Sequence, residues 1–395
     1  MRGRTARRTH GFTESVIRDM TRVARETGAI NLAQGFPDFP APEVLKEAAC
    51  RAIADDVNQY AITWGTPRLR TALAAKYARC YGMAVDEARE VTVTCGATEA
   101  MAAVVLALID PGEEILIFEP FYENYGPDAI LCDARPVFVP LAADGALDLD
   151  RLRAAVGQRT RALILNSPNN PTGHVLRADE LEAVAELCLE HDLLAITDEI
   201  YEHILYEGTH VPLASLPGMR ARTITVSGFS KTFSVTGWRV GTIVAPADLT
   251  AAIRKVHDFL TVGAPAPLQE ACAAGLELLG DNYYAGLATA YRERRDALVP
   301  ALQEAGFRCV PPRGAYYVMA DFSELSERDD VSYATWLAGG GAEGAAGGPG
   351  VAGVPGSSFH HEPGGGRSLL RFAFCKRVET LRAAGERLVA VAREA

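Results

Sequence analysis

The stretch SGFSKTFSVTGWRVG, residues 227–241, decides the fold, because it places Lys231 just after a strand and Arg239 eight residues later. The run TITVSGF, residues 223–229, is rich in β-branched residues and predicts a buried strand. A lone lysine usually lies on a solvated surface. At the end of a buried strand, an ammonium group must find a partner or lose its proton and become a nucleophile.

Strand and helix patterns alternate through the first three quarters of the chain. Residues 97–109 and 178–192 predict an apolar and an amphipathic helix. Short strands are predicted at 91–95, 114–120, 161–167, 193–199 and 223–229. This alternation predicts βαβ units, and therefore an α/β fold whose central sheet is mostly parallel and flanked by helices.

A chain of 395 residues is long enough for two domains. We expect a large domain over 46–290, a smaller α+β domain over 291–395, and an N-terminal segment, 1–45, that joins the small domain. The glycine-rich insertion AGGGAEGAAGGPG, residues 338–350, predicts a flexible surface loop. It contains a GxGxxG match, but no strand leads into it, so a dinucleotide-binding interpretation fails.

The composition excludes several classes of protein. A net charge of −11 argues against nucleic acid as the main partner, and no apolar run reaches the length of a membrane span. Eight scattered cysteines without a CxxC pair predict a reduced, cytoplasmic protein. His360 and His361 lie in a Gly/Pro-rich loop, where we expect them to be solvated and not to bind a metal.

Polar residues follow the predicted strands. Residues 96–98 stand between a strand and a helix, an arrangement that offers free N–H groups to an anion. Asn170, Asp198 and Lys231 follow three other strands. Because the carboxyl ends of parallel strands form one rim of an open sheet, we expect these groups to meet at a ligand site.

Each of these features alone has an ordinary explanation as a helix cap, a turn or a satisfied side chain. Together they match the needs of one cofactor, pyridoxal 5'-phosphate (PLP). PLP requires a lysine for its Schiff base, an anionic partner for its ring nitrogen, donors to its ring oxygen and a cationic phosphate site.

Several motifs in order, among them NLAQGFPDFP, SPNNPTG and LLRFAFCK, extend this match over nearly the whole chain. The sequence resembles the class I/II aminotransferases of the fold-type-I PLP enzymes, most of all the branch that holds the kynurenine, glutamine and methionine aminotransferases. The resemblance implies a PLP-dependent transaminase (EC 2.6.1.-) of amino-acid metabolism and biosynthesis, which moves an amino group from an L-amino acid to a 2-oxo acid by a ping-pong mechanism.

The resemblance also implies roles for individual residues. Lys231 corresponds to the Schiff-base lysine, Arg239 to the arginine that pairs with the phosphate, and Asp198 to the partner that keeps the ring nitrogen protonated. Asn170 and Tyr201 correspond to donors to the ring oxygen, with Tyr201 counted among the catalytic groups. The further cofactor contacts that it implies are Gly96, Ala97, Thr98, Tyr122, which stacks on the ring, and Ser230.

On the substrate side, Arg371 corresponds to the arginine that grips the α-carboxylate, and Gly35, Asn170 and Ile17 are implied to lie beside it. Tyr60 corresponds to a tyrosine that reaches the phosphate of the neighbouring subunit, which implies a homodimer. Ile17, Val262 and Gly263 stand where aromatic-preferring relatives carry aromatic or histidine side chains. This difference favours an aliphatic or elongated amino acid as the substrate.

Other reactions remain open at this point. The same residues would support a PLP-dependent β-lyase, an oxidase or a racemase, because the cofactor supplies the electron sink in all of them. A PLP-binding transcription regulator is a non-enzymatic alternative. Only about 30 residues precede QGFPDF, too few for a DNA-binding module, so we favour the enzyme.

Overall fold

A seven-stranded sheet lies at the centre of the larger lobe in the computed structural model, which describes residues 4–142, 145–341 and 350–392. Its strands, in spatial order, are β2 (Val91–Thr94), β8 (Gly241–Val244), β7 (Thr223–Gly228), β6 (Leu194–Asp198), β5 (Thr160–Asn166), β3 (Glu114–Glu119) and β4 (Arg135–Pro140). Only β8 runs antiparallel to its neighbours within this sheet. The predicted mostly parallel sheet is confirmed, with β4 and β8 added to the predicted strands.

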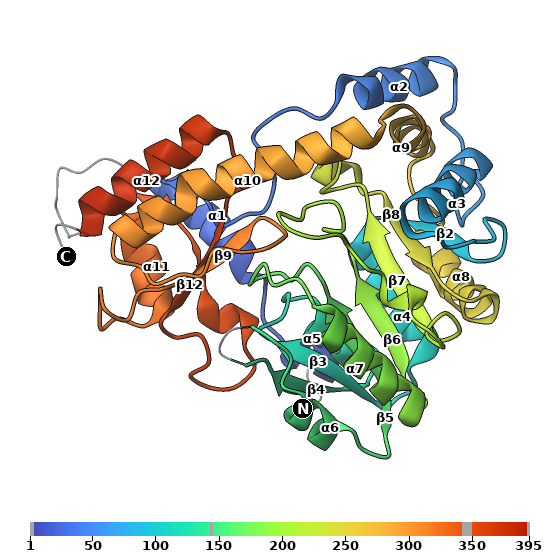
Figure 1. The fold of residues 1–395 in the computed structure, drawn as a ribbon, viewed down its shortest axis with the longest axis horizontal. Helices are drawn as coiled ribbons and strands as arrows, with labels where there is room; N and C mark the ends of the chain where they lie inside the picture. Colours follow the sequence, from blue (N-terminus) through green and yellow to red (C-terminus); the bar gives the residue numbers. More distant parts are fainter. Residues whose placement is uncertain (1–3, 143–144, 342–349, 393–395) are drawn as a thin grey trace.

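Helices cover both faces of this sheet (Figure 1). One face carries α4 (Ala97–Leu108), α5 (Tyr125–Leu131) and α8 (Ala247–Thr261), and the other carries α6 (Leu149–Ala155) and α7 (Ala178–Glu190). Ile115 and Ile117 pack into the first layer, whereas Leu116 and Phe118 pack into the second. Successive side chains of a strand point to opposite faces of the sheet. Along β6, this alternation places Asp198 on the same face as Leu194 and Ile196, which is the face that carries α5.

Three further helices close the edge of the sheet beside β2. They are α2 (Glu43–Ala54), α3 (Pro67–Tyr81) and α9 (Ala266–Leu278), and α9 packs against both of the others. The loop between α2 and α3 holds Tyr60.

The smaller lobe is built on an antiparallel sheet of β9 (Tyr317–Asp321), β12 (Leu369–Ala373) and β11 (Val354–Pro355). Its other elements are β1 (Ile30–Asn31), which pairs in parallel with β10 (Val351–Ala352), and the helices α1 (Val16–Thr27), α11 (Asp330–Ala338) and α12 (Val378–Ala392). Short 3-10 helices are η1 (Arg7–His10), η2 (Leu213–Ser215), η3 (Thr236–Trp238) and η4 (Gly356–Phe359). The described elements therefore form an α+β unit beside the α/β lobe.

The long helix α10 (Asp281–Glu304) connects the two lobes and packs along α12 (Figure 1). It runs through residue 290, so the boundary proposed from the sequence falls inside a helix. The segment before residue 45 contacts both lobes, because α1 packs on α11 and β10 while η1 lies against α5.

The glycine-rich insertion begins where α11 ends, at Ala338. Most of it, residues 342–349, lies outside the described residues, so its predicted loop character stays a prediction. Among the helices of the described ranges, none has the length and hydropathy needed to cross a bilayer.

Candidate active site

A cavity of about 1150 Å³ lies at the carboxyl ends of the central strands, between the two lobes. Twelve residues named from the sequence line it together: Ile17, Gly35, Ala97, Thr98, Tyr122, Asn170, Asp198, Tyr201, Ser230, Lys231, Arg239 and Arg371. They come from both lobes and from chain positions more than 350 residues apart. The cavity is therefore the candidate active site.

Lys231 follows β7 by three residues and is half-buried. Its Nζ atom lies 3.4 Å from the carbonyl oxygen of Gly35 and 5.7 Å from the ring centroid of Tyr316. Burial lowers the pKa of the ammonium to about 8, and the positive charge of Arg239 acts in the same direction. A substantial fraction of the side chain is thus a neutral amine near pH 8, the form in which a lysine is nucleophilic.

Asp198 ends β6 and is only 7% exposed. Its Oδ2 atom accepts a hydrogen bond of 2.7 Å from the Tyr125 hydroxyl, and its Oδ1 atom accepts one of 3.2 Å from the backbone N–H of Ile200. Burial raises the pKa of this carboxyl, while these two hydrogen bonds and the charge of Lys231 favour its ionised form. A cation placed against Asp198 would be paired with a desolvated carboxylate.

The first turn of α4 and Arg239 form a cationic corner of the cavity. Gly96 precedes α4 with φ of +82°, and a Cβ atom at this position would lie 2.3 Å from Nη2 of Arg239. Arg239 itself adopts a left-handed backbone conformation, with φ of 54°. Only glycine lets the guanidinium approach the helix N-terminus this closely, so both donors face one anion-sized space.

Arg371 lies on β12 and is 1% exposed. Nη1 donates to Oδ1 of Asn170 at 2.8 Å and Nη2 donates to the carbonyl oxygen of Ala33 at 2.7 Å. Its Nε atom is buried without a hydrogen-bond partner, and the guanidinium lies 4.4 Å from the ring centroid of Tyr317. A buried guanidinium with a spare N–H is suited to a small anion such as a carboxylate.

Tyrosines surround the space between these charged groups. The hydroxyls of Tyr201 and Tyr317 are 2.9 Å apart, and Tyr316 donates to the carbonyl oxygen of Gly35 at 2.9 Å. A Cβ atom on Gly35 would lie 2.2 Å from the hydroxyl oxygen of Tyr317. This position therefore requires glycine because of a close approach and not because of a turn.

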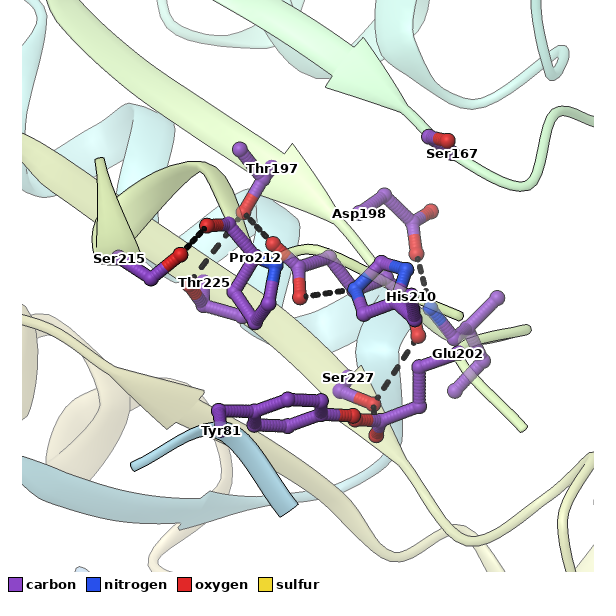
Figure 2. Close-up of polar contacts among 12 residues, drawn as sticks. Tyr81, Ser167, Thr197, Asp198, Glu202, His210, Pro212, Ser215, Thr225 and Ser227 are labelled. Atoms are coloured by element: carbon purple, nitrogen blue, oxygen red, sulfur yellow. Dashed lines mark hydrogen bonds and ion pairs between the residues drawn. The ribbon is translucent and has the colours of Figure 1, made fainter. Parts of the chain in front are cut away.

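A buried polar network lies next to Asp198 and outside the cavity lining, and Figure 2 shows most of its members. Glu199 accepts from Thr197 at 2.9 Å and pairs with His210 at 2.7 Å. Glu202 accepts from Ser227 at 2.8 Å and also binds Lys76 and Tyr81. Burial opposes ionisation of Glu202, but Lys76 and the neighbouring histidines outweigh it and hold its pKa below the usual range. The network joins the segment after β6 to β7, the strand that leads to Lys231.

Sequence reasoning missed Tyr125, Tyr316, Tyr317 and this network. Tyr125 stands three residues after Tyr122 in EPFYENY, but no sequence pattern connects it with Asp198. The network could not be anticipated, because its members come from α3, β6, β7 and the loop after β6.

Gly96, directly before Ala97, does not itself line the cavity, and three further predicted residues lie away from it. Tyr60 is 89% exposed, and Val262 and Gly263 follow the end of α8. A Cβ atom on Gly263 would lie 3.2 Å from the carbonyl oxygen of Thr63, in the same loop as Tyr60. These residues thus form a separate, outward-facing region.

Of the two histidines expected to be solvated, His361 is exposed, although it stacks on Phe138 at 4.3 Å. His360 differs from the expectation, because it is half-buried with Nδ1 3.0 Å from the carbonyl oxygen of Gly356. Both line the cavity. Within the described residues, no three metal-binding side chains gather at one point.

Comparison with known proteins identifies the class. Residues 27–388 match the family "Aminotransferase class I and II", and the chain belongs to this family. A probable N-succinyldiaminopimelate aminotransferase, DapC, of Mycobacterium tuberculosis is 42% identical, with 98% of each chain covered. The methionine aminotransferase of Escherichia coli is 38% identical, with 95% of each covered.

Solved structures agree with this assignment. The N-succinyldiaminopimelate aminotransferase from Mycobacterium tuberculosis superposes with a TM-score of 0.92, over 98% of this chain and 100% of that one. An aspartate aminotransferase from Thermus thermophilus, 35% identical, gives a TM-score of 0.90 over 99% and 100%. The fold is that of the fold-type-I PLP enzymes, and the chain is a PLP-dependent aminotransferase. The lyase and regulator alternatives find no support among these relatives.

Proposed function

We propose that the cavity is the site of amino transfer and that its residues hold the roles given above. The observation that carries this proposal is that one cavity holds both a lysine with a lowered pKa and a buried arginine with a spare N–H. The lysine suits attachment of the cofactor and proton transfer at Cα, and the arginine suits the α-carboxylate of an amino acid. PLP, when bound, supplies the electron sink for the Cα–H bond.

The residues around Lys231 fit PLP. The corner formed by Gly96, Ala97, Thr98 and Arg239 would hold the phosphate, since it combines N–H donors with a guanidinium. Asp198 would face the ring nitrogen with a desolvated carboxylate and so keep it protonated. Asn170 and Tyr201 would donate to the ring oxygen, and Tyr122 would pack on the ring face, with Ser230 beside them.

The chain's own groups then account for the proton transfers. Arg371 binds the α-carboxylate with the help of Asn170 and the backbone of Gly35, which fixes the Cα–H bond near Lys231. The free amine of Lys231 would accept the proton from Cα and later give it up, acting first as a base and then as an acid. Water would supply the carbonyl oxygen of the released 2-oxo acid, and the amino group would stay in the site until a second 2-oxo acid takes it up, which gives ping-pong kinetics.

We test the lysine assignment by borohydride reduction of the holoenzyme followed by peptide mapping. The pyridoxyl group is expected on Lys231. A label on any other lysine would overturn the arrangement, because all other roles are assigned relative to Lys231.

We further propose that the donor is an elongated L-amino acid. The cavity exceeds the range of about 300–1,000 Å³ common for ligand sites, and it extends to residues 9–18 and 357–361. Relatives at similar identity are named for methionine, kynurenine and N-succinyldiaminopimelate. A half-reaction screen, which follows the absorbance of the PLP form as each amino acid is added, tests this. Faster conversion by alanine than by any elongated donor would contradict it.

The homodimer also stays a proposal, supported by the exposure of Tyr60. If Tyr60 reaches the partner's phosphate, mixing two impaired variants, Lys231→Ala and Tyr60→Phe, restores one intact site in each mixed dimer. Partial recovery of activity is expected. No recovery in verified mixed dimers would show that each subunit builds its own site.

The free cysteines support a cytoplasmic location, and the acidic net charge argues against a nucleic-acid partner.

A further inference from the structure

His257, on α8, is a completely buried histidine outside the cavity lining, with 0% of its surface exposed. Its Nε2 atom lies 2.8 Å from the carbonyl oxygen of Thr63, and its Nδ1 atom lies 2.9 Å from Oε1 of Glu99. A carbonyl and a carboxylate only accept hydrogen bonds, so both ring nitrogens carry a hydrogen. His257 is therefore an imidazolium ion paired with the carboxylate of Glu99.

The electrostatic surroundings agree with this charge. Burial lowers the pKa of His257, but the hydrogen bond and the charge of Glu99 outweigh it and leave the pKa above the ordinary value for histidine. The other groups that face the ring are the carbonyl of Thr63 from the α2–α3 loop, and Asp258 and Thr261 from α8 itself. Glu99 is thus the ring's main counter-charge.

Both partners of His257 belong to segments assigned to a cofactor phosphate. Glu99 lies in the first turn of α4, directly after Ala97 and Thr98, and its Oε2 atom accepts from the backbone N–H of Cys95 at 3.0 Å. It therefore fixes the residues on either side of Gly96. Thr63 is three residues from Tyr60, in a loop whose tip is exposed.

The remaining ties between these segments are weaker or uncharged. Cys95 donates its thiol to the carbonyl oxygen of Gly263 at 3.3 Å, and Gly263 in turn approaches Thr63. The backbone N–H of Val93, on the strand before α4, donates to the carbonyl oxygen of Trp64 at 3.1 Å, and Gln269 joins Thr66 to the carbonyl oxygen of Ala264 and not to α4. Among these ties, only the imidazolium carries a charge.

We propose that His257 and Glu99 are a positioning pair for the PLP phosphate, holding the start of α4 for the chain's own cofactor and the Tyr60 loop for that of the partner. This rests on the phosphate roles given under the proposed function. Neither side chain lines the cavity, so the pair acts through Ala97, Thr98 and Tyr60.

The test measures the dissociation constant of PLP for the apoenzyme, by quenching of tryptophan fluorescence, in wild type and two variants. His257→Leu removes both bonds and should weaken PLP by about tenfold or more, the change that corresponds to losing one charge-assisted hydrogen bond. Glu99→Gln removes the charge but keeps every bond. Its amide oxygen accepts from Cys95, and its NH₂ group donates to a neutral His257 that still donates to Thr63.

A pH series separates positioning from bulk stability. In wild type, His257 loses its proton as pH rises through its raised pKa, and its bare Nδ1 then faces the Glu99 carboxylate, so PLP should bind more weakly. In Glu99→Gln this step is absent, because the histidine is already neutral. Titration of the phosphate and of Lys231 is common to both proteins and cancels in the ratio of their dissociation constants.

Two results together would overturn the inference: a ratio of the PLP dissociation constants of wild type and Glu99→Gln that does not change with pH, and an unchanged affinity of His257→Leu for PLP. If His257→Leu does not fold, the pH ratio for Glu99→Gln decides alone. Failure of the underlying phosphate assignment is recognised separately, since Arg239→Gln and Tyr60→Phe would then leave the PLP dissociation constant unchanged.

Discussion

The two halves of the cavity are built in different ways. The half around Lys231 is made of strand ends and one helix start within a single sheet, so its groups are fixed by backbone hydrogen bonds. The half around Arg371 joins β12 to residues 33–35 and to α1, segments that only tertiary packing brings together. The first half matches the requirements of the cofactor, whereas the second would hold the common α-carboxylate at Arg371 and, around it, offers the surfaces on which substrates differ.

The largest expected effect is at the centre of the first half. Lys231→Ala removes the group that attaches the cofactor and moves the proton, so turnover should fall by about 10²–10⁴ or more, the range for removal of a general base. Lys231→Arg, which keeps the charge but not a titratable amine, should be equally inactive. Single-turnover kinetics with an amino acid measure this, and near-normal rates in either variant would contradict the role.

Arg371 tests the second half. Because the α-carboxylate is common to all amino acids, Arg371→Ala should lower kcat/KM for every substrate by about 2–5 kcal/mol, the cost of removing one partner of a buried charged pair. Arg371→Lys should recover part of the loss, since it keeps the charge without the planar fork. PLP affinity serves as the control and should not change. A loss confined to one acidic substrate would make Arg371 a side-chain reader.

The lowered pKa of Lys231 predicts how the rate of PLP attachment depends on pH, a property of the first half of the cavity. Only the neutral amine attaches to PLP, and its fraction increases about tenfold per pH unit below the pKa. The rate of PLP attachment to the apoenzyme should therefore rise up to about pH 8 and level off above it. Stopped-flow absorbance measures this. A rise that continues to pH 10 would show an ordinary, solvated lysine.

A smaller effect is expected from Tyr125, which tests whether its hydrogen bond lowers the pKa of Asp198 in the first half of the cavity. Tyr125→Phe removes the hydrogen bond to Oδ2 of Asp198, worth about 1.5–3 kcal/mol for a charged acceptor. Because that bond favours the carboxylate, the pKa of Asp198 rises further without it, and the acid limb of the activity profile should move to higher pH.

Tyr206→Phe is the matched control for this change. Tyr206 is equally buried and donates to the carbonyl oxygen of Ala315, outside the cavity lining. It should lower stability without moving the pH profile. Equal profiles for the two variants would mean that Tyr125 does not tune Asp198.

The two halves also differ in what the sequence could predict. Lys231 and Asp198 follow strands that are visible as β-branched runs, so their meeting at one rim could be expected from sheet geometry. The contact of Tyr125 with Asp198 could not be predicted, because it depends on how α5 lies over the sheet. His360 was expected in solvent, yet its loop is held down by the Glu119 carboxylate, which accepts from the backbone N–H of His361 at 2.8 Å.

The same limit applies to the fold. The five predicted strands and the two helices between them are present, whereas the antiparallel direction of β8 carries no local signal. The pair of His257 and Glu99 joins residues 158 positions apart, and no spacing rule connects them. Contacts between distant segments are set by the packing of whole elements, which a local pattern does not contain.

The smallest effect is expected where the second half meets the substrate side chain. Ile17 is half-buried on α1 and lines the cavity, so Ile17→Phe should fill space used by long donors while leaving the α-carboxylate contacts intact. We expect the ranking of substrates to change by about 1–3 kcal/mol, with elongated donors losing and alanine unaffected. Val23→Phe, on the same helix but outside the cavity lining, is the control and should leave the ranking unchanged. The measurement is kcat/KM for alanine, methionine, glutamine, phenylalanine and an N-acylated diamino acid. If Ile17→Phe lowered all of them equally, Ile17 would support the fold of α1 and the side-chain pocket would have to lie elsewhere.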